Sequence, residues 1–175
     1  LAAGAAVNAQ NNEQRTALMA AALRGDTKTL ELLLSHQAQV NSTDNRGESA
    51  LFDAVRNGHL EAVRVLLAAG ANPNQKNNLP VSSAESAYTP LMLAAKYARA
   101  SNPQIWQDMM TELLARGADP NIVTGRGDSA LSVATQYGHQ AIAGLLRQRG
   151  AREQLSYIGL DLDHALIAAA RDGHV

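Results

Sequence analysis

The sequence contains no cysteine, and this absence excludes disulfide bonds, thiol nucleophiles and cysteine-ligated zinc. Aromatic side chains are also scarce, because only 3% of the residues are Phe, Trp or Tyr. Sandwiches and barrels of β-strands draw on aromatic and β-branched residues, so this composition argues against them. Alanine and leucine are abundant instead, and small side chains let helices approach one another closely. The composition therefore favours a helical protein.

An excess of basic residues is missing as well, since 15 basic and 16 acidic residues give a net charge of -1. Without such an excess the main driving force for binding phosphates is absent, and we expect no nucleic-acid partner. No apolar run approaches the roughly 18 residues needed to cross a bilayer, so we expect no membrane insertion. The first ten residues do not form a signal peptide, and a chain that begins at Leu1 suggests trimming. We expect a soluble protein, with the cytoplasm favoured and a periplasmic or secreted location left open if a signal was removed.

A repeat is present along the chain. Four segments begin with Thr or Ser and align with one another: TALMAAALRGD at 16–26, SALFDAVRNGH at 49–59, TPLMLAAKYAR at 89–99 and SALSVATQYGH at 129–139. A second segment closes each unit, as in AAGANPNQ around Gly70 and ARGADPNI around Gly117. The step along the chain from Gln37 to Gly70 equals the step from Gly117 to Gly150. A fixed period of about 33 residues predicts a stack of similar supersecondary units.

These segments resemble the ankyrin repeat, whose signature runs through T-P-L-H, A-A, G-H, L-L and G-A-D-x-N. The resemblance implies an all-α solenoid in which each repeat is a β-turn finger followed by two antiparallel helices. It covers nearly the whole chain as one domain, 1–175, and we expect the array to continue beyond one or both ends. The expected units are 1–10 (the end of a truncated repeat), 11–43, 44–76, 77–123 with two insertions, 124–156 and 157–175 (a partial final repeat).

Individual positions have physical roles within this repeat. Thr16, Ser49, Thr89 and Ser129 are expected to be helix N-caps, whose hydroxyls accept a bond from a free N–H in the first turn. Pro90 then stands at the first helical position, where a missing N–H costs nothing. The closing glycines Gly70, Gly117 and Gly150 are expected where the chain leaves the second helix with positive φ, and Gln37 should hold a strained or altered cap there. By resemblance, Asn8, Asn41, Asn74 and Asn121 tie successive fingers together, and His59, His139 and His174 are structural.

The third unit is longer than the others in two places. The step from Gly70 to Thr89 exceeds the matching step from Gly117 to Ser129 by seven, so the addition lies within Gln75–Tyr88. The step from Thr89 to Gly117 also exceeds its regular counterpart by seven, and this second addition lies around residues 98–108, between the two helices. It carries Trp106, which replaces the histidine of the G-H step, and we expect this side chain to cover apolar helix ends in preference to the alternative role of a binding anchor. The first insertion lengthens a finger, and contact with a partner and tolerated surface variation are equally supported.

Catalytic and metal-binding patterns are not evident in the sequence. No histidine and carboxylate pattern has metal-ligand spacing, no serine lies in a G-x-S-x-G elbow, and no paired carboxylates are discernible. The tripeptide Arg126-Gly127-Asp128 matches a motif of integrin ligands, but each of its residues also fits the finger of the repeat. We therefore expect no enzyme activity, no cofactor and no metal.

The resemblance implies that function lies in the surface that the repeats present. We predict that the chain is a monomer that binds a protein partner of unknown identity through its finger loops and the concave face of its first helices. A regulatory or inhibitory domain, such as one that neutralises a toxin, stays open as an alternative, and an enzyme is disfavoured. The candidate partner-binding residues are Arg15, Asn45, Arg46, Glu48, Arg56, Asn57, Tyr88, Lys96, Tyr97, Arg126, Asp128, Gln136 and Tyr137.

Overall fold

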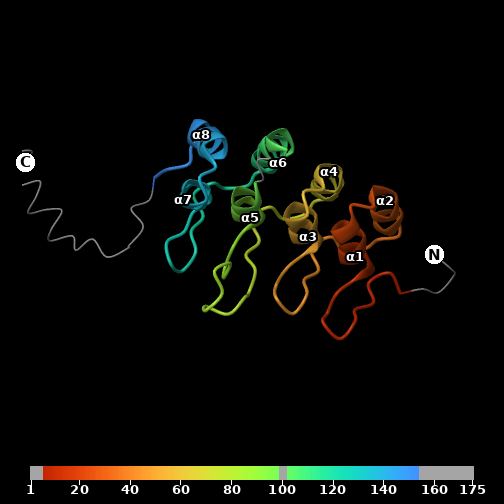
Figure 1. Ribbon diagram of the computed structural model, residues 1–175. Helices are drawn as coiled ribbons and strands as arrows, with labels where there is room; N and C mark the ends of the chain where they lie inside the picture. The colour runs from red at the N-terminus through yellow and green to blue at the C-terminus, as the bar shows by residue number, and fades with distance from the viewer. Residues whose placement is uncertain (1–5, 99–101, 154–175) are drawn as a thin grey trace, which may run out of the picture.

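The computed structural model describes residues 6–98 and 102–153, and within these ranges it contains eight helices and no strands. The helices come in pairs with short connections, and long finger loops lead from one pair to the next (Figure 1). The expected all-helical repeat architecture is confirmed, whereas the predicted final repeat at 157–175 lies outside the described residues. The helices are α1 (Ala17–Arg24), α2 (Thr27–Ser35), α3 (Ala50–Arg56), α4 (Leu60–Ala68), α5 (Pro90–Tyr97), α6 (Pro103–Ala115), α7 (Ala130–Gln136) and α8 (Gln140–Gln148).

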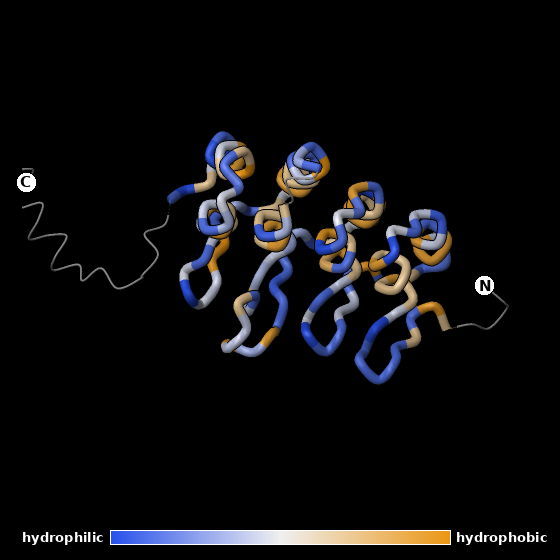
Figure 2. Tube along the Cα trace, in the orientation of Figure 1, coloured by the Kyte–Doolittle hydropathy of each residue, from blue (hydrophilic) through white to orange (hydrophobic). Residues whose placement is uncertain are grey.

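The helices form two rows. The inner row consists of α1, α3, α5 and α7, next to the fingers, and the outer row consists of α2, α4, α6 and α8 (Figure 1). Hydrophobic residues are concentrated in the helices, while the fingers are largely hydrophilic (Figure 2). One helix pair cannot bury its apolar face alone, so the core is continuous from repeat to repeat. The same position of the outer helices fills this core in every repeat, with buried Leu33, Leu66, Leu113 and Leu146.

All four predicted N-cap residues stand directly before an inner helix. The hydroxyls of Thr16, Thr89 and Ser129 accept hydrogen bonds from the backbone N–H three residues later. Ser129 also forms a capping box, because the hydroxyl of Ser132 accepts a bond from the backbone N–H of Ser129. Ser49 has the extended backbone of an N-cap but makes no side-chain cap bond, so that part of the prediction is wrong for α3.

The outer helices end as predicted. Gly70, Gly117 and Gly150 have φ values of 87°, 88° and 87°, in the left-handed region. Gln37 adopts the same kind of conformation with φ 64°, although its side chain makes it costly there. The first outer helix therefore ends in a strained cap.

Four asparagines bind each finger to the next repeat, which confirms their predicted role. Each side-chain amide donates to the carbonyl at the closing position of the following helix pair, and each side-chain oxygen accepts from a backbone N–H two residues beyond that position. The pairs are Asn8 with Gln37, Asn41 with Gly70, Asn74 with Gly117 and Asn121 with Gly150, at Nδ2–O distances of 3.3, 3.1, 2.8 and 3.1 Å. The bond of Asn74 spans 43 residues instead of 29, so both insertions are accommodated inside one continuous solenoid.

The second insertion is mostly helical, which corrects the expectation that it lies between the two helices. Relative to α3 and α4, four of its residues lengthen α6, two lengthen the connection and one lengthens α5. Trp106 belongs to α6 and is only 5% exposed. Its ring packs against Gly58 of the preceding repeat, as the ring of His59 packs against Gly25 one repeat earlier. The predicted packing role of Trp106 is therefore confirmed.

The first insertion lies entirely within the third finger, as predicted. The backbone N–H of Asn77 donates to the carbonyl of Tyr88 at 3.0 Å and closes this finger. The regular second finger is closed in the same way by Asp44 and Glu48. The closing pair is therefore four positions apart in a regular finger and eleven apart here. The added loop lies beside α5, because Glu85 accepts hydrogen bonds from Lys96 and Tyr97.

Candidate partner-binding surface

The fingers and the adjacent side of the inner helices form one surface, which faces away from the outer row (Figure 1). Most of the predicted binding residues are accessible there. Leu23, in the helix row of the same surface, is 45% exposed, and Tyr137 is 44% exposed. The exposed candidates are Asn45, Arg46, Asn57, Arg126, Gln136 and Tyr137, and the half-buried ones are Arg15, Arg56, Lys96, Tyr97 and Asp128.

Two candidates are not accessible. Glu48 is 1% exposed and Tyr88 is 3% exposed, so the expectation that they lie on the surface is wrong. Glu48 turns inward because the guanidinium of Arg56 and the side-chain amide of Asn77 both donate to its carboxylate. Tyr88 belongs to the hydrophobic core, and burial raises the pKa of its phenol. Both residues are buried beneath the surface and cannot contact a partner directly.

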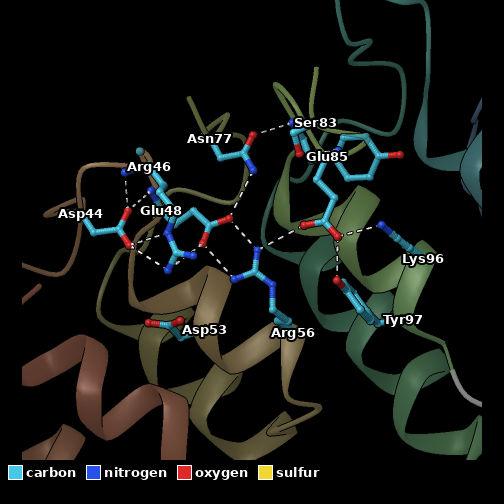
Figure 3. Close-up of polar contacts among 12 residues, drawn as sticks. Asp44, Arg46, Glu48, Asp53, Arg56, Asn77, Ser83, Glu85, Lys96 and Tyr97 are labelled. Atoms are coloured by element: carbon cyan, nitrogen blue, oxygen red, sulfur yellow. Dashed lines mark hydrogen bonds and ion pairs between the residues drawn. The ribbon is translucent and has the colours of Figure 1, made fainter. Parts of the chain in front are cut away.

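The centre of the surface is a connected polar network (Figure 3). Arg56 of α3 binds Glu48 with two hydrogen bonds, at 2.8 and 2.5 Å, a bidentate geometry that fixes the guanidinium plane. The same guanidinium lies 3.4 Å from Glu85 of the inserted finger loop. Glu85 also accepts a bond from the Nζ of Lys96 at 2.7 Å and one from the Oη of Tyr97 at 2.6 Å. The inserted loop is thus bound to two neighbouring inner helices.

The electrostatics of this network favour the ionised forms. Burial by itself would raise the pKa of Glu85, but hydrogen bonds from Lys96 and Tyr97 outweigh burial and lower it. The bonds to Glu48 raise the pKa of Arg56. Burial, followed by the bond to Glu85, raises the pKa of Tyr97, which keeps the phenol protonated as a donor. At neutral pH the network therefore contains paired charges and a neutral tyrosine.

A second cluster joins the first two fingers. Arg15 donates to Asp44 at 3.2 Å and to Asp53 of α3 at 2.6 Å. Asp53 is only 3% exposed, and burial raises its pKa more than Arg15 lowers it. Arg46 lies on the outside of this cluster, with a side chain that is 49% exposed and a 3.4 Å contact to Asp44. Arg15 is therefore a connector between repeats, while Arg46 is accessible to a partner.

The fourth repeat completes the surface. Arg126 donates to the carbonyl of Ala84 in the inserted loop at 2.7 Å, and its Nε lies 3.5 Å from Asp128. The ammonium of Lys96 lies 5.7 Å from the ring centre of Tyr137, within the range of a cation–π contact. The two charged residues of the Arg-Gly-Asp tripeptide are thus paired with each other, and Arg126 also bonds to the neighbouring finger.

Sequence reasoning missed three acidic members of these networks, Asp44, Asp53 and Glu85. Asp53 could have been found, because it stands in α3 where the aligned segments have Ala20, Leu93 and Val133, and a carboxylate at such a position requires a partner. Glu85 carried no comparable signal. It lies in an irregular insertion, and its partners come from other elements.

The described residues contain no group of three or more His, Cys, Asp or Glu side chains that could hold a metal ion. None of the described helices is long and apolar enough to cross a membrane. An apolar hollow of about 130 Å³ lies between the start of α6 and the start of α8, lined by Ala98, Trp106, Ile142 and their neighbours. His139 also lines it, with its Nε2 3.3 Å from the backbone carbonyl oxygen of Lys96.

Comparisons with known proteins agree with this architecture. A family model described as "Ankyrin repeats (3 copies)" matches residues 1–77, and one described as "Ankyrin repeat" matches residues 87–125. The crystal structure of an ankyrin repeat domain from Acinetobacter baumannii AYE is 36% identical in sequence and superimposes with a TM-score of 0.75. The match covers 86% of this chain and 72% of that chain. No curated protein sequence matches the chain.

Proposed function

The chain belongs to the ankyrin-repeat family, and we propose that it binds a partner protein through its finger loops and the exposed side of its inner helices. Ankyrin repeats are in general protein–protein interaction modules. The partner and the binding residues are inferred from the surface of this particular chain.

The observation that carries the proposal is the chemistry of the exposed residues that the framework does not use. Caps, asparagine bridges and core leucines account for the shared positions, yet Arg46, Arg126 and Tyr137 remain accessible on one side. Arginine and tyrosine are the residues that most often carry binding energy at interfaces. Asn45, Asn57 and Gln136 surround them with adaptable hydrogen-bonding groups.

An enzymatic function has less support. Arg15, Arg56 and Lys96 on this surface each pair with carboxylates of the chain, within one repeat or between two neighbouring repeats. A catalytic group would need a polar side chain directed at a substrate-sized cleft. One hollow between α6 and α8 is apolar. A second, of about 330 Å³, is lined by polar side chains that include Gln104 and Asp108, and its open floor of α6 and α8 residues holds no pair of carboxylates.

The test is a double substitution on the proposed surface. Proteins captured from lysate by the immobilised chain are identified by mass spectrometry, and their affinity for variants is measured by biolayer interferometry. Tyr97→Ala combined with Tyr137→Ala should weaken binding about tenfold or more, because truncating an interfacial tyrosine commonly costs more than about 1 kcal/mol. The melting temperature should change little.

Two further variants make the result specific. Tyr97→Ala also removes a hydrogen bond to Glu85 and can therefore loosen the inserted loop. Tyr137 makes no hydrogen bond to that loop, so weaker binding of Tyr137→Ala alone reports the loss of a direct contact with the partner. Leu32→Ala removes a similarly exposed side chain, 47% accessible, from the outer row. The proposal is wrong if the captured protein binds the double variant and the Leu32 variant equally well.

A further inference from the structure

The inserted finger does more than project from the solenoid. Its Glu85 side chain turns back to the inner helices and is only 14% exposed. There it meets the guanidinium of Arg56, the ammonium of Lys96 and the hydroxyl of Tyr97 (Figure 3). We call these three residues the carboxylate seat. Three donors from α3 and α5 thus converge on one carboxylate in the middle of the candidate surface.

The carboxylate seat belongs to the regular repeats and not to the insertion. Arg56 and Lys96 occupy the same position in aligned inner helices, and Tyr97 follows in the next position. The carboxylate of Glu48 neutralises the charge of Arg56 through a bidentate pair. When Glu85 leaves the seat, the positive charge of Lys96 therefore lacks an opposite charge. The fourth-repeat cation, Arg126, is paired with Asp128. A single negative charge therefore suits the seat better than a doubly charged phosphate.

Few contacts hold the inserted loop against the inner helices and the neighbouring fingers. The base of the finger is closed by Asn77 and Tyr88, and its outer turn is internally bonded from Ser83 to Pro80. Next to the base, the backbone N–H of Asn78 donates to the Arg46 carbonyl of the second finger at 2.6 Å. Farther out, the Glu85 side chain meets the seat, and the Ala84 carbonyl accepts from Arg126. The outer turn is otherwise open, with Val81 80% exposed. Such a loop can leave the seat while its base stays in place.

We propose that Arg56, Lys96 and Tyr97 form a binding site for a carboxylate side chain of an acidic partner segment, and that Glu85 occupies this site in the free protein as an internal competitor. This inference rests on the proposed function and specifies the chemistry of its partner. The partner carboxylate replaces Glu85, and the freed loop is then available at the edge of the interface. Apparent affinity is reduced by the fraction of molecules in which Glu85 fills the site.

The experiment removes Glu85 from the chain and adds it back as part of a separate peptide. Deleting residues 79–85 leaves a third finger whose closing residues are as far apart as those of the regular second finger. The probe is a synthetic peptide with the sequence of residues 77–88, added to the isotope-labelled shortened chain and followed by NMR. We expect chemical-shift changes at Arg56, Lys96 and Tyr97. The full chain should bind the same peptide about tenfold more weakly.

Matched variants define the site. A peptide with Gln in place of Glu85 should bind the shortened chain about tenfold more weakly, and so should the natural peptide with a shortened Lys96→Met chain. Arg64→Ala removes one positive charge from the outer row and should leave the affinity unchanged. The full-length Glu85→Ala chain provides a second route to an emptied site, should the deletion unfold the protein.

The outcomes are decisive in both directions. Equal affinity for the Glu and Gln peptides, or tighter binding of inorganic phosphate than of the Glu peptide, overturns the inference. So does equal affinity of the full and shortened chains. If these arms fail while Tyr137→Ala still weakens capture of the partner, the proposed function stands and only the carboxylate site is wrong.

Discussion

Most charged side chains on this surface form ion pairs with other side chains of the chain. Asp44, Glu48 and Asp53 are buried, and each receives a guanidinium from Arg15, Arg46 or Arg56. Burial of a carboxylate is tolerated only with such a partner, because an unpaired buried charge is strongly unfavourable. The pairs of Arg15 therefore connect two repeats, and the pairs of Arg46 and Arg56 fix the second finger within its own repeat. Only the exposed members can also contact a partner.

The Glu85 carboxylate should make stability depend on pH in a defined direction. Its folded-state pKa lies below the ordinary value of 4.5, so its contribution is present above about 4.5 and is lost as the pH falls through the folded-state pKa. The difference in unfolding free energy between the natural chain and Glu85→Gln should be largest at neutral pH and shrink in acid. Urea unfolding at a series of pH values, followed by circular dichroism, measures this difference.

Ser82→Ala is the control for that series. Ser82 lies in the same loop, is exposed and makes no side-chain hydrogen bond to the described residues. It should keep the full pH dependence of the natural chain. Parallel curves for the natural chain and Glu85→Gln would contradict the assigned role of Glu85.

At the scale of elements, the inner helices share a start signal but do not all use it in the same way. Ser129 accepts a cap bond and forms a capping box, whereas Ser49 stands at the equivalent position without a cap bond. Both are serines before Ala-Leu, but the residue three positions later is Ser132 in one case and Phe52 in the other, so only α7 can form the capping box. The missing cap bond of Ser49 itself is a matter of side-chain geometry that the sequence does not show.

The two serines should therefore respond differently to substitution. Ser129→Ala should lower the free energy of unfolding by about 1 kcal/mol, the usual cost of losing an N-cap bond. Ser49→Ala should cost clearly less, because no cap bond is lost. Urea unfolding of the two variants side by side tests this, and equal losses would show that the capping difference has no energetic weight.

Across the whole molecule, stability comes from contacts between neighbouring repeats. The asparagine bridges continue through the third repeat even though its two insertions lengthen the span of Asn74 to 43 residues. The first insertion lengthens a loop, which accepts added residues at low entropic cost. The second mostly lengthens α6, which still packs against α4 and α8, so the stacking continues. The inserted residues therefore belong to one continuous solenoid and do not divide it into two domains.

Asn74→Ala should weaken the coupling of adjacent repeats. It removes the bonds to the Gly117 carbonyl and from the Asp119 N–H, and we expect the free energy of unfolding to fall by about 1 to 2 kcal/mol. Asn78→Ala is the control, because Asn78 is exposed and its side chain makes no bond to the described residues. Equal stability of the two variants would show that the Asn74 hydrogen bonds do not contribute to the coupling of adjacent repeats.

Much of the framework could be predicted from the sequence. The fixed spacing of the aligned segments located the units, and Thr16, Pro90 and Gly70 occupy the predicted helix boundaries. The site was predictable only in part. Burial of Glu48 and Tyr88 was missed, since adjacent positions in a finger differ in exposure for reasons that lie in the neighbouring repeat.

The sequence by itself determined the repeat and three of the four inner-helix cap bonds, because these depend on local rules that recur at a fixed spacing. The asparagine bridges followed from the resemblance to a known repeat. Only the tertiary structure decided that the long third finger folds back onto the inner helices. Glu85 meets partners that are 29, 11 and 12 residues away, on two different helices. No periodic signal encodes such a meeting, since it depends on how two repeats stack and where an irregular loop turns.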